Sequence, residues 1–343
     1  MLTFRTAAIA ATALVVAGVA TASAQEFSLR IQNHQSPESL SGKHIAQWVE
    51  DVEVMSGGRV DIEMFYSSPI VKSAETFDAA INGIVDGDFT NASYLTGKDT
   101  AFQFVSDVMG GYDTPWEFYA WLYNGGGMEI AQELYNSYGM HLLGWQIPGP
   151  ESMNATKPLR GPDDLVDWKF RSPPGMQTMI FENLGATPVV IDFTEVFTSL
   201  ETGIIDGADV SNVSTNRSMG IYELTDHSTY PGFHSMPADH FSIRLDLWES
   251  FPDDIKRIME VAMQKTSFRT TIDYMVDIQV AAKELEEDGT VTFHDWSTED
   301  RATFRASARK AWREFADTEI ANRLVDSHIE FMNTLGLSAA DIE

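Results

Sequence analysis

The feature that most constrains the fold is a short sequence unit that occurs twice. Glu75-Thr-Phe77 is followed by Gly83-Ile-Val-Asp-Gly87, and Glu195-Val-Phe197 is followed by Gly203-Ile-Ile-Asp-Gly207, with the same internal spacing. Each copy has the pattern of a helix that stops at a glycine and feeds a short strand through a turn. Such units also recur by chance in α/β proteins, but the shared Glu-x-Phe start favours a duplication. The sequence therefore predicts two lobes with one copy each.

The surrounding segments indicate a parallel sheet and a long helix. Residues 27–31 and 60–65 alternate like strands, and 41–55 between them has apolar residues at helical spacing, which makes a β-α-β unit. The chain has neither Pro nor Gly between Pro252 and Asp288. We therefore expect one long helix, which would reach roughly 50 Å, or a bent pair. A second helical stretch follows at about 297–335.

No linker or low-complexity segment separates the two copies, so interleaved lobes are expected. The predicted class is α/β, with two discontinuous lobes joined by hinge segments and by the long helix. We assign residues 25–148 and 236–275 to lobe I, and residues 149–235 and 276–343 to lobe II.

The N-terminus has the pattern of a secretory signal peptide. Arg5 precedes an apolar run from Ala7 to about Ala20, and the triplet Ala22-Ser-Ala24 matches a cleavage site, so residues 1–24 are predicted to be removed after Ala24. The run is too short for a typical membrane-spanning helix, although an N-terminal anchor is the alternative. We expect an exported protein that acts in the periplasm.

Charge and cysteine content exclude several kinds of partner. The chain has no cysteine, which excludes disulfides and thiolate metal sites. Its formal net charge is −28, and loss of Arg5 leaves 22 − 51 = −29. This charge repels phosphate backbones, so nucleic acid is not expected as a partner. An anionic ligand would need locally placed cations or a metal ion.

The two copies also predict where a ligand binds. The strands that they feed, around 88–92 and 208–212, should end at matching places on the two lobes, and ligands of α/β sheets collect at the carboxyl ends of strands. The cleft should then be lined by Asn91 and Tyr94 from one lobe and by Asp209, Val210 and Asn212 from the other. The histidines His234 and His240 have no helical zinc spacing, and we do not assign them a site.

Several stretches resemble the solute-binding proteins of tripartite ATP-independent periplasmic (TRAP) transporters, the DctP-like family. The most specific are Leu165-Val-Asp-Trp-Lys-Phe-Arg171, Leu184-Gly-Ala-Thr-Pro188, Phe193-Thr-Glu-Val-Phe197 and Gly203-Ile-Ile-Asp-Gly207. Phe102-Gln-Phe104, Trp121-Leu-Tyr-Asn-Gly-Gly-Gly127 and Tyr230-Pro-Gly232 are similar to the branch that binds 2-oxo acids and other monocarboxylates. The resemblance implies a two-lobed periplasmic binding protein and not an enzyme.

The resemblance places Arg171 on the arginine that holds the ligand carboxylate. A guanidinium suits this role because its planar fork donates two parallel hydrogen bonds and keeps its charge. Without the resemblance, Arg171 would be interpreted as a surface arginine paired with an acidic neighbour. Tyr94 and Phe193 are expected as walls of the site, and ordinary core packing is their alternative interpretation.

The resemblance also implies a bound Na⁺ or Ca²⁺ that bridges the protein to the ligand. Asp209 falls on an acidic ligand of that cation, and Val210 on a residue that offers its backbone carbonyl, where the branch has tryptophan. Glu151 falls where the branch has glutamine, and Ser235 where a further acid is expected. These departures leave a metal-free alternative open, in which Glu151 binds an ammonium or hydroxyl group of the ligand.

The predicted function is a receptor that captures a small organic acid between its lobes and delivers it to the membrane subunits of a TRAP transporter. The alternative is a secreted hydrolase that uses Glu151 and Asp209 as paired carboxylates. The C-terminal dimerisation helix of some relatives is missing after Leu335-Gly-Leu337. We therefore expect a monomer.

Overall fold

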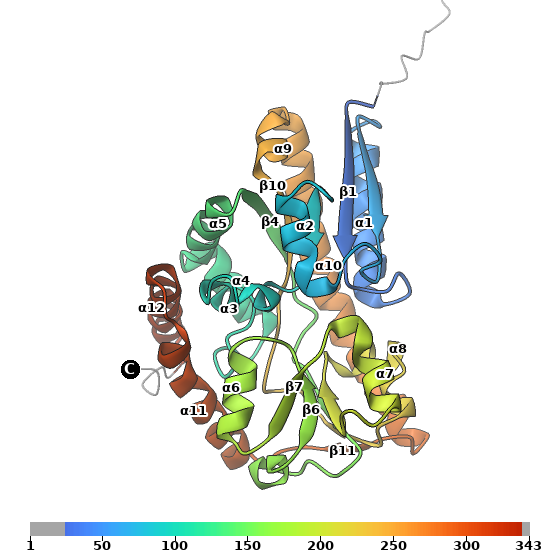
Figure 1. Cartoon of the computed structure of the whole chain (residues 1–343), viewed down its shortest axis with the longest axis vertical. Helices are drawn as coiled ribbons and strands as arrows, with labels where there is room; N and C mark the ends of the chain where they lie inside the picture. The colour runs from blue at the N-terminus through green and yellow to red at the C-terminus, as the bar shows by residue number, and fades with distance from the viewer. Residues whose placement is uncertain (1–24, 338–343) are drawn as a thin grey trace, which may run out of the picture.

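A computed structural model describes residues 25–337, and the predicted signal peptide lies outside them. The chain forms two sheets, one in each half of the molecule (Figure 1). The first has the order β2 (Val60–Phe65), β1 (Phe27–Asn33), β3 (Gly87–Phe89), β10 (Asp239–Arg244) and β4 (Met140–Gln146). The second has the order β11 (Thr292–His294), β9 (His227–Thr229), β5 (Met153–Ala155), β8 (Gly207–Asp209), β6 (Lys169–Ser172) and β7 (Thr187–Val190). The predicted α/β class and its two lobes are confirmed.

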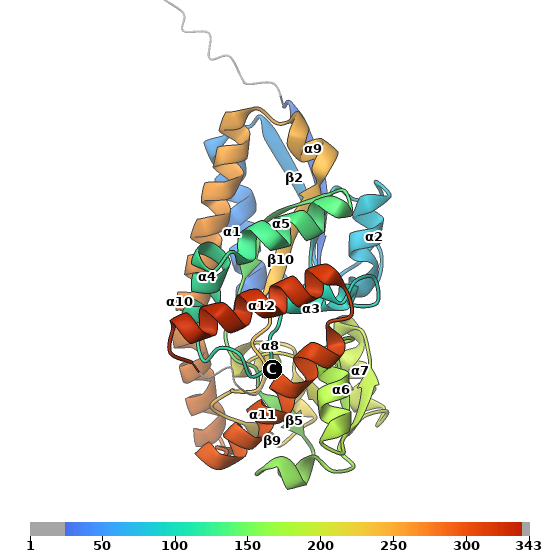
Figure 2. The same cartoon turned by 90° about the vertical axis from the view of Figure 1, so that its left-hand side faces the viewer.

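The described chain passes between the lobes at four places, the last of them between the two C-terminal helices described below. It crosses after β4 and returns before β10, and α10 (Asp253–Glu287) then runs along both lobes (Figure 2). This helix has 35 residues and packs against α1 and β4 in the first lobe and against α8 in the second. Because no Pro or Gly interrupts it, the helix is continuous over about 50 Å.

Short helices cover the sheets. They are α1 (Leu40–Met55), α2 (Thr76–Ile81), α3 (Ala101–Phe104), α4 (Pro115–Asn124), α5 (Gly127–Ser137), α6 (Met176–Asn183), α7 (Val196–Glu201), α8 (Val213–Ser218) and α9 (Leu245–Ser250). Five 3₁₀ turns are also described, namely η1 (Ser73–Glu75), η2 (Ala92–Leu95), η3 (Pro162–Leu165), η4 (Phe193–Glu195) and η5 (Ile221–Glu223). Among residues 25–337, none of the helices combines the length and hydropathy needed to span a bilayer.

The C-terminal helices join the lobes from outside. α11 (Thr298–Phe315) packs on α6 of the second lobe, whereas α12 (Glu319–Thr334) packs on α3 and α5 of the first. The predicted division gave the whole of 276–343 to lobe II, and the packing of α12 departs from it. The sequence of an amphipathic helix reveals which of its faces is apolar. It does not reveal which lobe that face packs against. The remaining lobe boundaries stay our proposal.

The duplicated unit folds in the same way in both lobes. Each copy enters through a 3₁₀ turn and a helix, and then reverses at a glycine with positive φ, 73° at Gly83 and 70° at Gly203. The turn that follows is tied to the neighbouring strand by Asp86 N donating to Arg30 O at 2.6 Å in one lobe, and by Asp206 N donating to Lys169 O at 2.7 Å in the other. Strand β6 is therefore the counterpart of β1.

One core residue makes the fold sensitive to acid. His328 of α12 is fully buried, stacks on Trp121 with ring centroids 3.7 Å apart, and lies 2.8 Å from the Phe104 carbonyl oxygen through Nε2. Burial lowers the pKa of its imidazole from 6.5 to about 3. The unfolded chain therefore binds one more proton than the folded chain between these values, and this contribution to stability is lost as pH falls through them.

We expect His328→Gln to unfold with a shallower pH dependence than the parent chain below pH 6.5. At pH 4.5 the histidine is expected to cost about 3 kcal/mol, because this pH lies two units below the unfolded pKa of 6.5 and still above the folded pKa of about 3. Urea unfolding of both proteins between pH 4 and pH 8 measures the difference. Parallel stability curves over that range would contradict the assignment.

Candidate functional site

A buried cavity lies between the two sheets, and most of the predicted site residues line it. Its wall includes Asn91, Tyr94, Glu151, Arg171, Phe193, Val210 and Ser235. Asp209 is fully buried and borders the site through its contacts with Arg171 and Gln177. Asn212 is not part of the wall, because its side chain caps α8 and donates to the Pro148 carbonyl. The cavity volume is about 40 Å³, which is room for only a few water-sized groups.

Arg171 is held in place by backbone carbonyls. It lies near the end of β6 and is only 2% exposed. Its Nε donates to the Ile191 carbonyl oxygen at 3.1 Å, and its Nη1 donates to the Asp209 carbonyl oxygen at 2.6 Å. The third nitrogen, Nη2, is buried without a hydrogen-bond partner. Among residues 25–337 no carboxylate forms an ion pair with it, so a positive charge and a free donor are available to a ligand.

Two carboxylates and a histidine cluster beside Arg171. One candidate ligand atom from each of Glu151, Asp209 and His234 lies within 4.8 Å of the others, and all three residues are buried. Asp209 Oδ2 lies 2.8 Å from His234 Nε2 and accepts a hydrogen bond from Gln177, whereas Oδ1 has no partner. Burial raises the pKa of the Glu151 carboxyl well above its usual value, and the charges of Asp209 and Asp107 raise it further.

Asp107 from the first lobe adds a third carboxylate. Ser235 Oγ donates to its Oδ2 at 2.6 Å, and Met236 N donates to its Oδ1 at 3.2 Å. Burial raises the pKa of this carboxyl to about 6. Asp107 thus brings a carboxylate to Ser235, the position at which the family resemblance predicts an acid.

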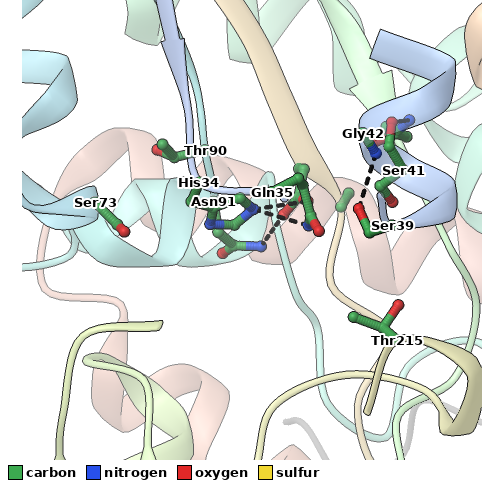
Figure 3. A network of polar contacts seen from close by, with 12 residues as sticks. His34, Gln35, Ser39, Ser41, Gly42, Ser73, Thr90, Asn91 and Thr215 are labelled. Carbon is green, nitrogen blue, oxygen red and sulfur yellow. Dashed lines mark hydrogen bonds and ion pairs between the residues drawn. The ribbon is translucent and has the colours of Figure 1, made fainter. Parts of the chain in front are cut away.

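The wall from the first lobe is a polar network that includes His34, Gln35 and Asn91 (Figure 3), and all three bind Asp239. His34 Nε2 lies 3.1 Å from Asp239 Oδ2, Gln35 donates to the same oxygen at 3.1 Å, and Asn91 donates to Oδ1 at 3.0 Å. Burial alone would raise the pKa of Asp239, but the charge of His34 and these hydrogen bonds outweigh it and lower that pKa. Asn91 also accepts from Ser106, so its amide serves mainly to hold Asp239.

The aromatic residues meet across the cleft. Phe193 of the second lobe stacks on His34 of the first, with ring centroids 4.7 Å apart and an interplanar angle of 24°. The Tyr94 hydroxyl lies 3.3 Å from His34 Nδ1, and burial raises the pKa of this phenol. These three rings enclose the apolar side of the cavity.

Sequence reasoning missed several residues of the site. His34 and Gln35 follow β1 as Asn91 follows β3, so the strand-end argument used for Asn91 would have found them. His234 was judged only against zinc spacings. Gln103 lies within Phe102-Gln-Phe104, a stretch of the family resemblance, but was not assigned to the site, and nothing in the sequence points to Asp107 or Gln177.

The comparisons with known proteins agree on one family. The family model described as "Bacterial extracellular solute-binding protein, family 7" (DctP) matches residues 31–319. A monocarboxylate 2-oxoacid-binding periplasmic protein of Nostoc is 28% identical over 222 residues, which is 62% of this chain and 58% of that protein. The C4-dicarboxylate-binding periplasmic protein DctP of Rhodobacter capsulatus is 26% identical over 91% of this chain and 93% of its own length.

Solved structures share the fold. An apo, open TRAP periplasmic solute-binding protein of Rhodobacter sphaeroides is 31% identical, with a TM-score of 0.71, over 90% of this chain and 98% of its own. One from Pseudoalteromonas atlantica with bound sodium and pyruvate is 24% identical, with a TM-score of 0.82, over 91% of this chain and 95% of its own. The predicted receptor is confirmed and the alternative hydrolase is not supported, because the matched family and these neighbours are solute-binding receptors. The chain is therefore a member of the DctP family of bacterial extracellular solute-binding proteins.

Proposed function

We propose that this receptor captures a small monocarboxylate between its lobes in the periplasm, after cleavage behind Ala24, and delivers it to TRAP membrane subunits. The observation that carries the proposal is the buried Arg171 guanidinium, which is anchored by two carbonyls and keeps Nη2 free at the cavity. A carboxylate would satisfy this donor and neutralise its charge in a site with little water. The neighbours with bound acids support the ligand class.

The small cavity favours a short acid. A volume of about 40 Å³ fits an acid of a few carbon atoms better than a sugar acid, which would require a wider separation of the lobes. A thermal-shift screen of 2-oxo, 2-hydroxy, sugar and aromatic acids tests the proposal. We expect the largest rise in melting temperature with short 2-oxo or 2-hydroxy acids. The proposal fails if no carboxylate in the screen stabilises the protein.

We further propose that a cation binds with the acid. Asp107, Glu151 and Asp209 are all buried at a site with a single unpaired guanidinium, so a bound monoanion leaves an excess of buried carboxylates. The residues fit a hard cation, because Asp209 Oδ1 is buried without a hydrogen-bond partner and the nearby charges of Asp209 and Asp107 raise the pKa of the Glu151 carboxyl, a repulsion that a cation would relieve. Glu151, Asp209 and the Val210 carbonyl would hold it, with His234 beside them. Ser235 is already bound to Asp107, and we leave it out of this set.

Removing the cation is expected to weaken the stabilisation by ligand. The measurement is the shift in melting temperature with acid at saturation, first with Na⁺ replaced by choline and then with EGTA added to remove Ca²⁺. A smaller shift in either condition identifies the cation, because ligand stabilisation follows the apparent affinity. An equal shift in all conditions would favour the metal-free site, in which Glu151 binds an ammonium or hydroxyl group of the ligand.

A further inference from the structure

Two helical segments at the rim of the cleft begin without a capping side chain of their own. Helix α6 starts at Met176 after Gly175, which has no side chain, and η1 starts at Ser73 after Lys72, whose side chain caps nothing. The first N–H groups of a helix have no partner within it, so each start needs an acceptor from elsewhere. At α6 the opposite lobe supplies the acceptor for a backbone N–H, and at η1 it supplies an acceptor for the hydroxyl of the first residue, Ser73.

Gln103 of the first lobe caps α6 of the second. Its Oε1 accepts from Met176 N at 2.9 Å, while its Nε2 donates to the Asp107 carbonyl at 2.7 Å. The approach requires glycine at 175, since a Cβ there would lie 2.5 Å from Gln103 Oε1 and φ is +117°. The two lobes are therefore closely packed where Gln103 approaches Gly175.

Asp192 of the second lobe accepts a hydrogen bond from the first lobe. Its Oδ1 accepts from Ser73 Oγ at 2.9 Å, and the same oxygen accepts from Thr194 N at 3.1 Å at the start of its own η4. Asp192 and Lys72 occupy the same position in the two copies of the duplicated unit, three residues before Glu195 and Glu75. One carboxylate thus serves the helical starts of both copies. Ser73 stands at the rim of the first lobe in Figure 3.

We propose that reciprocal capping across the cleft stabilises the closed form of the receptor, with Asp192 and Ser73 acting as positioning residues that never touch the ligand. Neither residue lines the ligand cavity, whereas Gln103 does. The Ser73–Asp192 bond requires the lobes to be together, and water takes its place when they separate. Any contact made only in the closed form raises the closed population, and apparent ligand affinity rises with it. The inference rests on the proposed capture of a ligand by closure.

The test combines lobe distance with ligand affinity. Because the chain has no cysteine, Asn82→Cys and Thr202→Cys give two unique labelling sites on exposed positions of opposite lobes. Spin labels there report the open and closed populations with and without the acid found in the screen. Ser73→Ala is expected to shift the population toward the open form and to weaken apparent affinity about three- to tenfold, the range of a lost cap.

A double-mutant cycle isolates the contact. Ser73→Ala should have no further effect in an Asp192→Ala background, whereas two independent effects would add. Lys98→Ala is the matched control, because it removes only an ion pair within the first lobe, with Asp78, and should stay within about twofold of the parent. The capping idea is overturned if both Ser73→Ala and Asp192→Ala leave distances and affinity unchanged. Failure of every variant and of the parent to bind any acid would instead overturn the proposed function.

Discussion

Replacing Arg171 with alanine is expected to weaken binding of the acid about a hundredfold or more. The change removes the only unpaired buried guanidinium among the described residues that line the cavity and leaves the ligand carboxylate facing Asp209 and Glu151. Loss of one partner of a buried charge pair costs about 3 kcal/mol, which corresponds to about a hundredfold in affinity. Isothermal titration calorimetry with the acid identified in the screen measures the effect.

Two further variants separate charge from geometry. Arg171→Lys keeps the charge but cannot donate to the two carbonyls and the ligand at once, so we expect an intermediate loss. Arg217→Ala is the control, because Arg217 is exposed and paired with Glu284 on the outside of the molecule. Affinity of Arg171→Ala within about threefold of the parent, with an unchanged fold, would refute the role of this arginine.

Replacing Glu151 with glutamine is expected to change stability and ligand binding in opposite directions. The buried Glu151 carboxyl has a raised pKa, so it contributes stability below its ordinary pKa and loses that contribution as pH rises through the folded value. Glutamine has nearly the same shape without the charge, and we expect the ligand-free variant to gain about 1–3 kcal/mol at pH 8. The gain should shrink toward pH 4.

The same substitution removes a proposed cation ligand. Ligand affinity of Glu151→Gln should fall and should depend less on Na⁺ or Ca²⁺ than that of the parent. Calorimetry with and without each cation measures this, and urea unfolding at pH 4 to 8 measures the stability. Glu287→Gln serves as an exposed control carboxylate, because its ion pair with Lys283 lies within α10. A variant that is less stable without ligand but keeps the full cation dependence would contradict both parts of the interpretation.

The parts of the fold that depend on local sequence could be predicted. The glycines at 83 and 203 mark turns that only a positive φ permits, and the missing Pro and Gly after 252 allow a continuous α10. The place of α12 could not be predicted, because its apolar face fits either lobe until the tertiary packing selects one.

The candidate site divides in the same way. Tyr94 and Val210 were found because they follow strands, and the family resemblance carried Arg171 and Glu151. Asp107 reaches Ser235 from a loop 128 positions away, a pairing that exists only after the chain has reached its tertiary fold. That Asn91 is engaged with Asp239 and Ser106 likewise depends on neighbours distant in the chain.

The correspondence of β1 with β6 gives the cleft a direction. Ile31 and Phe170 pair with the equivalent glycines 87 and 207, so Gln32 is the counterpart of Arg171. The Gln32 amide is fully used, since it donates to Val71 O and Thr76 Oγ1 and accepts from Ile70 N. Of these two equivalent positions, only Arg171 of the second lobe offers a positive charge to an incoming anion. The acid should therefore bind the second lobe first, before the first lobe closes over it. The two lobes share a backbone arrangement but carry different side chains at this position. Ligand binding is therefore sequential, with the second lobe making the first contact and the first lobe closing over the bound acid.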